Sequence, residues 1–127
     1  MNLKVTLTIT SLLSIVLFSF HWVDEISRGL ETAGVSGLFG VLILVVWLYG
    51  TLALAERRSG YIITLLGSIF GLAVLITHMR GAGLVGSRIA NTSGIFFWVW
   101  TLITLGVTSS FSLILSARGL WSLRRGR

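Results

Sequence analysis

Residues 38–55 read LFGVLILVVWLYGTLALA, a run of 18 residues that contains no charged side chain. A helix needs about 20 mostly apolar residues to cross the hydrocarbon core of a bilayer. Neither this run nor the rest of the chain contains proline. Residues 38–55 therefore predict a membrane-crossing helix.

Three further segments have the same apolar character and a similar length: about 5–22, 61–78 and 95–117. One short charged joint and two longer polar or glycine-rich joints separate the four segments. This spacing predicts four transmembrane helices in an up-down-up-down bundle. We expect an all-α integral membrane protein with one domain over residues 1–127, whose last part, 118–127, is a basic amphipathic tail.

The composition supports a lipid environment. Of the 127 residues, 54% are hydrophobic and 11% are charged, whereas soluble domains carry about 25% charged residues. There is no cysteine, which excludes disulfides, thiolate metal sites and thiol catalysis.

The net charge is +6, and the basic residues lie at the ends of the apolar runs. Topology alone places them there, so we do not expect a nucleic-acid ligand. The side that holds the N-terminus would carry Lys4, Arg57, Arg58, Arg118, Arg124, Arg125 and Arg127, and the other side Arg28, Arg80 and Arg88. The positive-inside rule then predicts cytoplasmic N- and C-termini, in a membrane that we expect to be a bacterial inner membrane.

Two further expectations concern the membrane interfaces. Aromatic residues near the predicted outer boundary are typical of an interfacial belt: Trp22, Phe96, Phe97, Trp98 and Trp100. On the inner side, we expect the arginine-rich tail to contact anionic inner-leaflet lipids, and Glu56 to pair with the neighbouring Arg57 and Arg58.

The stretch SFHWVDEISRG, residues 19–29, follows the first apolar run and carries His21, Asp24, Glu25 and Arg28. Their spacing is i, i+3, i+4 and i+7, so a helix would present all four on one face. His78, the only other histidine, ends the third apolar run. Because the first and third helices would run in the same direction, both imidazoles are predicted to lie in the same leaflet.

Two imidazoles and two carboxylates are a plausible ligand set for Zn, Fe, Mn or Cu. The candidate metal ligands are thus His21, Asp24, Glu25 and His78. Alternatively, His21 and His78 could bind a haem from its two sides. A simpler interpretation is interfacial polarity, with Asp24 and Arg28 forming only a surface ion pair.

Small residues line the predicted inward faces. Gly67 and Gly71 form a G-x-x-x-G pattern, which allows close helix approach. Ser14 and Ser68 belong to hydroxyl stripes that favour helix packing. These positions could serve the bundle itself, a homo-oligomer or another membrane-protein partner.

The sequence therefore favours a small membrane protein that binds a metal or haem at its extracytoplasmic end and acts in redox chemistry or metal handling. One alternative is a non-catalytic subunit or an oligomeric transporter or channel. Another is an enzyme acting on lipid headgroups, because the polar cluster offers acid and base groups. The chain has no H-E-x-x-H motif and no nucleophile elbow, which favours a non-enzymatic role.

Overall fold

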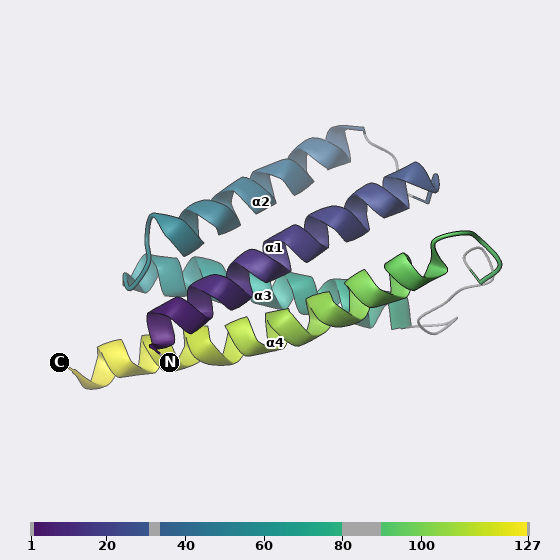
Figure 1. The fold of residues 1–127 in the computed structure, drawn as a ribbon. Helices are drawn as coiled ribbons and strands as arrows, with labels where there is room; N and C mark the ends of the chain where they lie inside the picture. The colour runs from purple at the N-terminus through teal and green to yellow at the C-terminus, as the bar shows by residue number, and fades with distance from the viewer. Residues whose placement is uncertain (1, 31–33, 80–89, 127) are drawn as a thin grey trace.

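The structure, a computed structural model, describes residues 2–30, 34–79 and 90–126. Within these residues it is all-helical, with four helices and no strand (Figure 1). The helices are α1 (Leu3–Ser27), α2 (Val35–Leu52), α3 (Arg58–Met79) and α4 (Ile95–Arg125). The prediction of an all-helical protein with four helices is confirmed.

Three of these helices, α1, α3 and α4, are long and apolar enough to cross a membrane. The apolar stretch of α2, Gly37–Leu52, is shorter. At about 1.5 Å per residue, even the 18 residues of α2 approach the thickness of the hydrocarbon core. The fold therefore fits an integral membrane protein.

All four helices differ from the predicted segments, α2 and α3 by up to three residues at an end and α1 and α4 by more. The prediction placed the end of the first segment at Trp22, where hydrophobicity falls, but α1 continues through Asp24 and Glu25 to Ser27. It stops just before Gly29, whose φ of +68° is left-handed. Similarly, α4 continues to Arg125, so most of the predicted tail is part of this helix. Helix ends follow backbone hydrogen bonding here, and not the limit of the apolar run.

Polar contacts between α1 and α4 keep one register along the bundle. Ser112 Oγ donates to Thr10 Oγ1 at 2.9 Å, and Ser14 Oγ donates to Thr108 Oγ1 at 2.9 Å. Further along, His21 Nδ1 lies 3.1 Å from Thr101 Oγ1. From pair to pair the residue number rises on α1 by as much as it falls on α4, so the two helices pack antiparallel along this seam.

The contacts of α2 and α3 use small residues and one buried tryptophan. Trp47 of α2 is almost fully buried, and its Nε1 donates to Ser11 Oγ at 3.0 Å. Its ring covers Gly67 of α3, while Gly71 faces Ser109 of α4. Both glycines are therefore used inside the bundle. Ser14 and Ser68 are also fully buried there.

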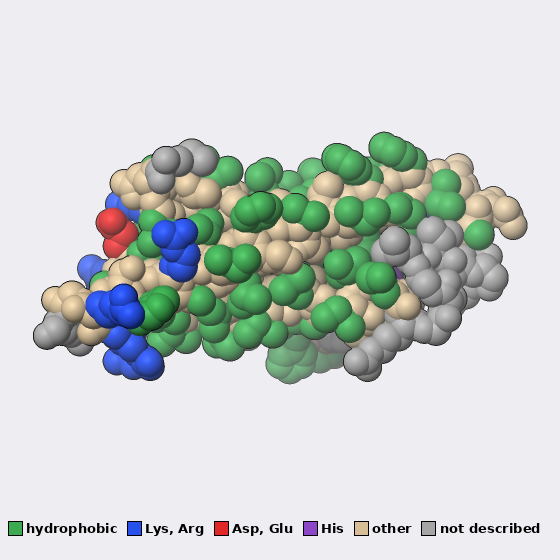
Figure 2. Space-filling view, turned by 90° about the horizontal axis from the view of Figure 1, so that it is seen from below, with side chains coloured by type: hydrophobic (Ala, Val, Ile, Leu, Met, Phe, Trp, Pro, Cys, Tyr) green, Lys and Arg blue, Asp and Glu red, His purple; other side chains and the backbone are tan. Residues whose placement is uncertain are grey.

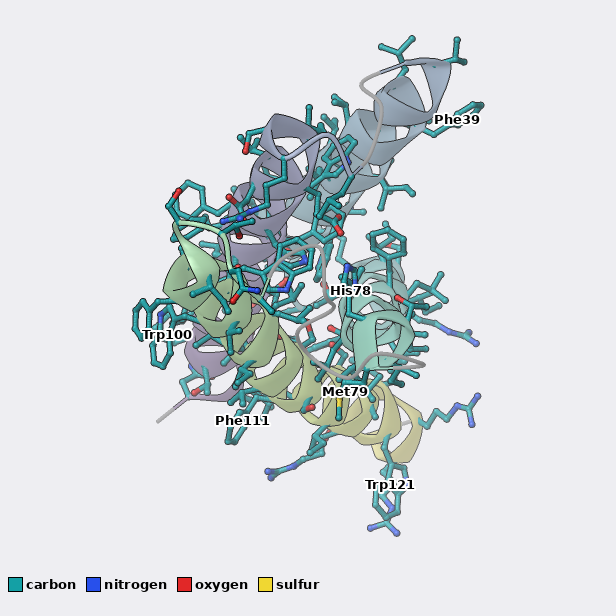
Figure 3. The ribbon with its side chains drawn as sticks, turned by 90° about the vertical axis from the view of Figure 1, so that its right-hand side faces the viewer. Phe39, His78, Met79, Trp100, Phe111 and Trp121 are labelled. Carbon is teal, nitrogen blue, oxygen red and sulfur yellow. The ribbon has the colours of Figure 1, made fainter. Side chains whose placement is uncertain are left out.

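The outer surface is largely apolar along the helices and basic at one end. Figure 3 shows Phe39, Trp100, Phe111 and Trp121 pointing away from the bundle, and all four are more than half exposed. Lys and Arg side chains gather at the end where both chain termini lie (Figures 1 and 2).

At this end Lys4 Nζ donates to Glu56 Oε2 at 2.9 Å. Lys4 is therefore the ion-pair partner of Glu56, where the sequence suggested Arg57 and Arg58. Of the charged residues used to predict topology, Arg80, Arg88 and Arg127 lie outside the described residues.

Candidate metal site

Three of the four predicted metal ligands converge at the end of the bundle opposite the termini. His21 and Glu25 lie one turn apart on α1, and His78 lies near the end of α3. One potential ligand atom from each of these residues lies within 4.8 Å of the other two. Figure 3, which looks onto this end, shows His78 on the side of α3 that faces α1 and α4. This group could hold a metal ion.

The ring of His21 is fully buried and fixed by α4. The hydroxyl of Thr101 donates to the carbonyl oxygen of Phe97 at 2.9 Å. Because that hydroxyl has a single proton, we assign the Nδ1–H of His21 as the donor in its contact with Thr101 Oγ1, at 3.1 Å. In the neutral ring, Nε2 then carries the lone pair. That atom is buried and has no hydrogen-bond partner among the described residues.

His78 is oriented in the same way by its own helix. Its Nδ1 lies 2.7 Å from the carbonyl oxygen of Val74, which can only accept. Nδ1 therefore carries a proton, and Nε2 faces the Glu25 carboxylate at 2.6 Å. The same carboxylate oxygen lies 3.9 Å from His21 Nε2. Metal-binding histidines typically donate their second ring N–H to a backbone carbonyl or a carboxylate, as His78 Nδ1–H does to the Val74 carbonyl.

This arrangement brings electron-rich atoms together. With both Nδ1 atoms protonated, two neutral imidazoles would present lone pairs to one carboxylate. The contact of 2.6 Å between His78 Nε2 and the Glu25 carboxylate has the length of a charge-assisted hydrogen bond, in which a protonated Nε2 donates to the carboxylate. A metal ion in place of that proton would require these two atoms to move apart, and it would also satisfy the buried Nε2 atom of His21.

Asp24 lies on the same face of α1 but belongs to a different set of contacts. Its carboxylate accepts from Arg28 Nε at 2.9 Å, the ion pair that the i,i+4 spacing suggests. The rest of the Arg28 guanidinium donates to Thr92 Oγ1 at 2.6 Å and to the Ser93 carbonyl oxygen at 3.0 Å. Asp24 thus helps Arg28 to hold the segment before α4, and it lies outside the group that could hold a metal.

Trp98 belongs to the site, although the sequence assigned it to the interfacial aromatic belt. It is only 2% exposed, so it does not face lipid as a member of the predicted aromatic belt. Its ring centroid lies 4.4 Å from that of His21 and 5.3 Å from that of His78. The spacing of Trp98 to Thr101 and Leu105 places the three on one helical face, and this was the available signal. All three side chains are buried in the bundle, which is why Trp98 faces the histidines and not the lipid.

Met79 follows His78 in the sequence but is 53% exposed. A helix directs consecutive residues about 100° apart. His78 faces the cluster from this helix, so the exposed Met79 side chain points away from the cluster. The described site therefore offers nitrogen and oxygen ligands.

Comparisons with models of known protein families, with curated proteins and with solved structures find no match to this chain. Function must accordingly be argued from the chemistry of the site.

Proposed function

We propose that this protein is a four-helix transmembrane protein that binds a divalent transition-metal ion at its extracytoplasmic end and acts there in metal handling. The ligands would be His21 Nε2, His78 Nε2 and the carboxylate of Glu25. The carrying observation is the buried Nε2 atom of His21, which faces the other two ligands without a hydrogen-bond partner in the described residues.

The proposed orientation has both termini in the cytoplasm and an up-down-up-down course. It is supported by the basic end of the molecule, where the exposed side chains of Lys4, Arg57, Arg58, Arg118, Arg124 and Arg125 lie. Positive charge near helix ends is retained on the cytoplasmic side of bacterial inner membranes. His21 and His78 would then lie in the outer leaflet, within reach of the extracytoplasmic space.

The ligand set suits a single ion better than a haem. Two imidazoles and a carboxylate form three-residue sites for Zn²⁺ and for non-haem iron, and they leave a coordination position open. A haem held by both histidines would need its macrocycle between the two rings. Glu25 occupies that region, 2.6 Å from His78 Nε2 and 3.9 Å from His21 Nε2, and Trp98 packs against both rings.

Binding at one surface is favoured over conduction through the bundle. One turn below His21, Phe18 is 6% exposed, and Leu102 and Leu105 of α4 are fully buried. These side chains separate the candidate site from the hydroxyl pair formed by Ser14 and Thr108. An ion that crossed this apolar layer would lose its ligands and hydration together, which is costly in the membrane interior.

Zn²⁺ binding to the purified protein tests this proposal. Wild-type protein in mild detergent should bind one ion, measured by calorimetric titration and by elemental analysis after gel filtration. His21→Gln, Glu25→Gln and His78→Gln should each weaken binding by more than the roughly 10- to 100-fold expected from losing only a group that orients a ligand.

Asp24→Asn is the matched control, since it removes a carboxylate next to Glu25 on the same helix. The control should bind Zn²⁺ as wild type does. If Asp24→Asn lost as much Zn²⁺ affinity as the ligand variants, the loss would be explained by surface charge alone. Wild-type protein that binds no Zn²⁺, Cu²⁺, Fe²⁺ or Mn²⁺ would refute the proposal.

A further inference from the structure

A second candidate site lies at the opposite end of the molecule, between the first turns of α3 and the last turns of α4. The two helices meet there, with Gly119 of α4 against the ring of Tyr61 of α3. Beside this contact is a groove of about 300 Å³ lined by Arg58, Ile62, Leu120, Leu123 and Arg124. Its volume is at the lower end of the range for small-molecule sites.

The groove combines two uncompensated charges with an apolar floor. Arg58 and Arg124 are exposed, and neither takes part in an ion pair within the described residues. The acid nearest in sequence, Glu56, is already paired with Lys4. Arg125, the neighbour of Arg124, instead stacks its guanidinium over the ring of Trp121 at 4.1 Å.

We propose that this groove binds the headgroup of an anionic phospholipid. Two guanidinium groups from different helices line the same groove, and arginine donates paired N–H bonds to phosphate. Ile62, Leu120 and Leu123 would contact the first carbons of the acyl chains below it. A soluble anion would use the arginines but would gain nothing from the apolar floor.

The location of the groove agrees with a lipid ligand. Trp121 is 58% exposed, as expected for an aromatic side chain at the boundary between headgroups and hydrocarbon. It belongs to the last turns of α4, at the end that carries both termini (Figure 1), and lies between Arg118 and Arg124 in the sequence. An anionic lipid there would neutralise two arginines that α3 and α4 bring together from positions 58 and 124.

Native mass spectrometry of the detergent-solubilised chain tests the site, with phosphatidylglycerol and phosphatidylcholine as probes. Each basic residue near an anionic membrane surface contributes about 1 kcal/mol. The double variant Arg58→Gln/Arg124→Gln should therefore weaken phosphatidylglycerol binding by roughly 30-fold. Binding of phosphatidylcholine should not change. Gel filtration of the variant checks that it retains the folded state.

The matched control is Arg57→Gln/Arg118→Gln, which removes two exposed charges from the same end but none from the groove. It should keep most of the phosphatidylglycerol binding, whereas Arg58→Lys/Arg124→Lys, which preserves the charges but not the paired N–H donors, should keep only part of it. The proposal is overturned if the control loses as much as the groove variant, or if phosphatidylcholine binds equally well. Displacement of the lipid by millimolar inorganic phosphate would also overturn it, because the groove would then be a free-anion site.

Discussion

His21 and His78 are each held by their Nδ1 atoms, and this leaves their Nε2 atoms for chemistry. His78 uses the carbonyl oxygen of Val74 on its own helix, whereas His21 uses Thr101 on α4. The second contact joins helices that are distant in sequence. Thr101 is therefore the residue that connects the orientation of His21 to the packing of the bundle.

We predict that Thr101→Val weakens Zn²⁺ binding about 10- to 100-fold, the usual effect of removing a partner that orients a metal-binding histidine. Valine keeps the shape of threonine but cannot accept from His21 Nδ1–H. Calorimetric titration of the purified variant measures the change in affinity.

Thr104→Val is the control for this prediction. Thr104 lies one turn further along α4, and its hydroxyl bonds to backbone carbonyl oxygens of its own helix. The Thr104→Val variant should bind Zn²⁺ as wild type does. Equal affinity in the Thr101 and Thr104 variants would show that the histidine is not oriented by α4.

At this scale the sequence identified three of the residues that meet. The i,i+4 spacing of His21 and Glu25, with His78 in the same leaflet, was enough to predict their proximity. The sequence could not distinguish Glu25 from Asp24 as a metal ligand, because both lie on the same polar face of one helix. The difference depends on Arg28, which binds Asp24, and on the approach of α3, which places His78 against Glu25.

At the scale of the elements, each helix interface has its own chemistry. Hydroxyl pairs join α1 and α4, and the close approach of α2 to α3 depends on Trp47 and Gly67. The Trp47 ring is almost fully buried and is fixed through its Nε1 atom to Ser11. It cannot rotate away without losing that hydrogen bond.

Gly67→Ala should therefore destabilise the bundle by about 1–3 kcal/mol, the typical cost of overpacking. The added Cβ would meet the fixed ring of Trp47. The measurement is unfolding of the protein by a denaturing detergent in mixed micelles, followed by circular dichroism.

The same substitution at Gly37 is the control, because a Cβ there would meet only Trp22, at an ordinary contact distance of 3.9 Å. Gly37→Ala should leave stability unchanged or slightly raised, since alanine is the better helix former. If both variants unfold alike, the fit of Trp47 against Gly67 does not limit helix packing.

The helices themselves were predictable because long apolar runs without proline have few other structures available in lipid. Their rotation about their own axes was predictable only in part, from the stripes of small and hydroxyl residues. Trp98 illustrates this limit, since the sequence of α4 places tryptophans at positions 98 and 100. Only the packed bundle shows that the first is buried against the histidines and that the second is exposed.

At the scale of the whole molecule, the two ends have different charges and different proposed ligands. The end with the chain termini carries exposed arginines and the groove between α3 and α4. The opposite end carries the histidine–glutamate group. Buried apolar residues, Phe18 on α1 and Leu105 on α4, lie between the two ends along these helices, so each end should bind its ligand independently.

The proposed orientation can be measured with single cysteines, because the chain has none of its own. Ser27→Cys should react with a membrane-impermeant maleimide added outside intact cells, since Ser27 ends α1 on the proposed extracytoplasmic side. Ser59→Cys, at the start of α3, should react only after the membrane is opened. The reverse labelling pattern would place the candidate metal site on the cytoplasmic side.

The central claim is that His21, Glu25 and His78 bind one ion together, and X-ray absorption at the zinc edge of the Zn²⁺-loaded protein tests it most directly. The account predicts two imidazole nitrogens at about 2.0–2.1 Å and carboxylate oxygen at about 2.0–2.2 Å. The imidazole scattering should decrease in His21→Gln and in His78→Gln but not in Asp24→Asn. A zinc shell made only of oxygen, without imidazole scattering, would contradict the account.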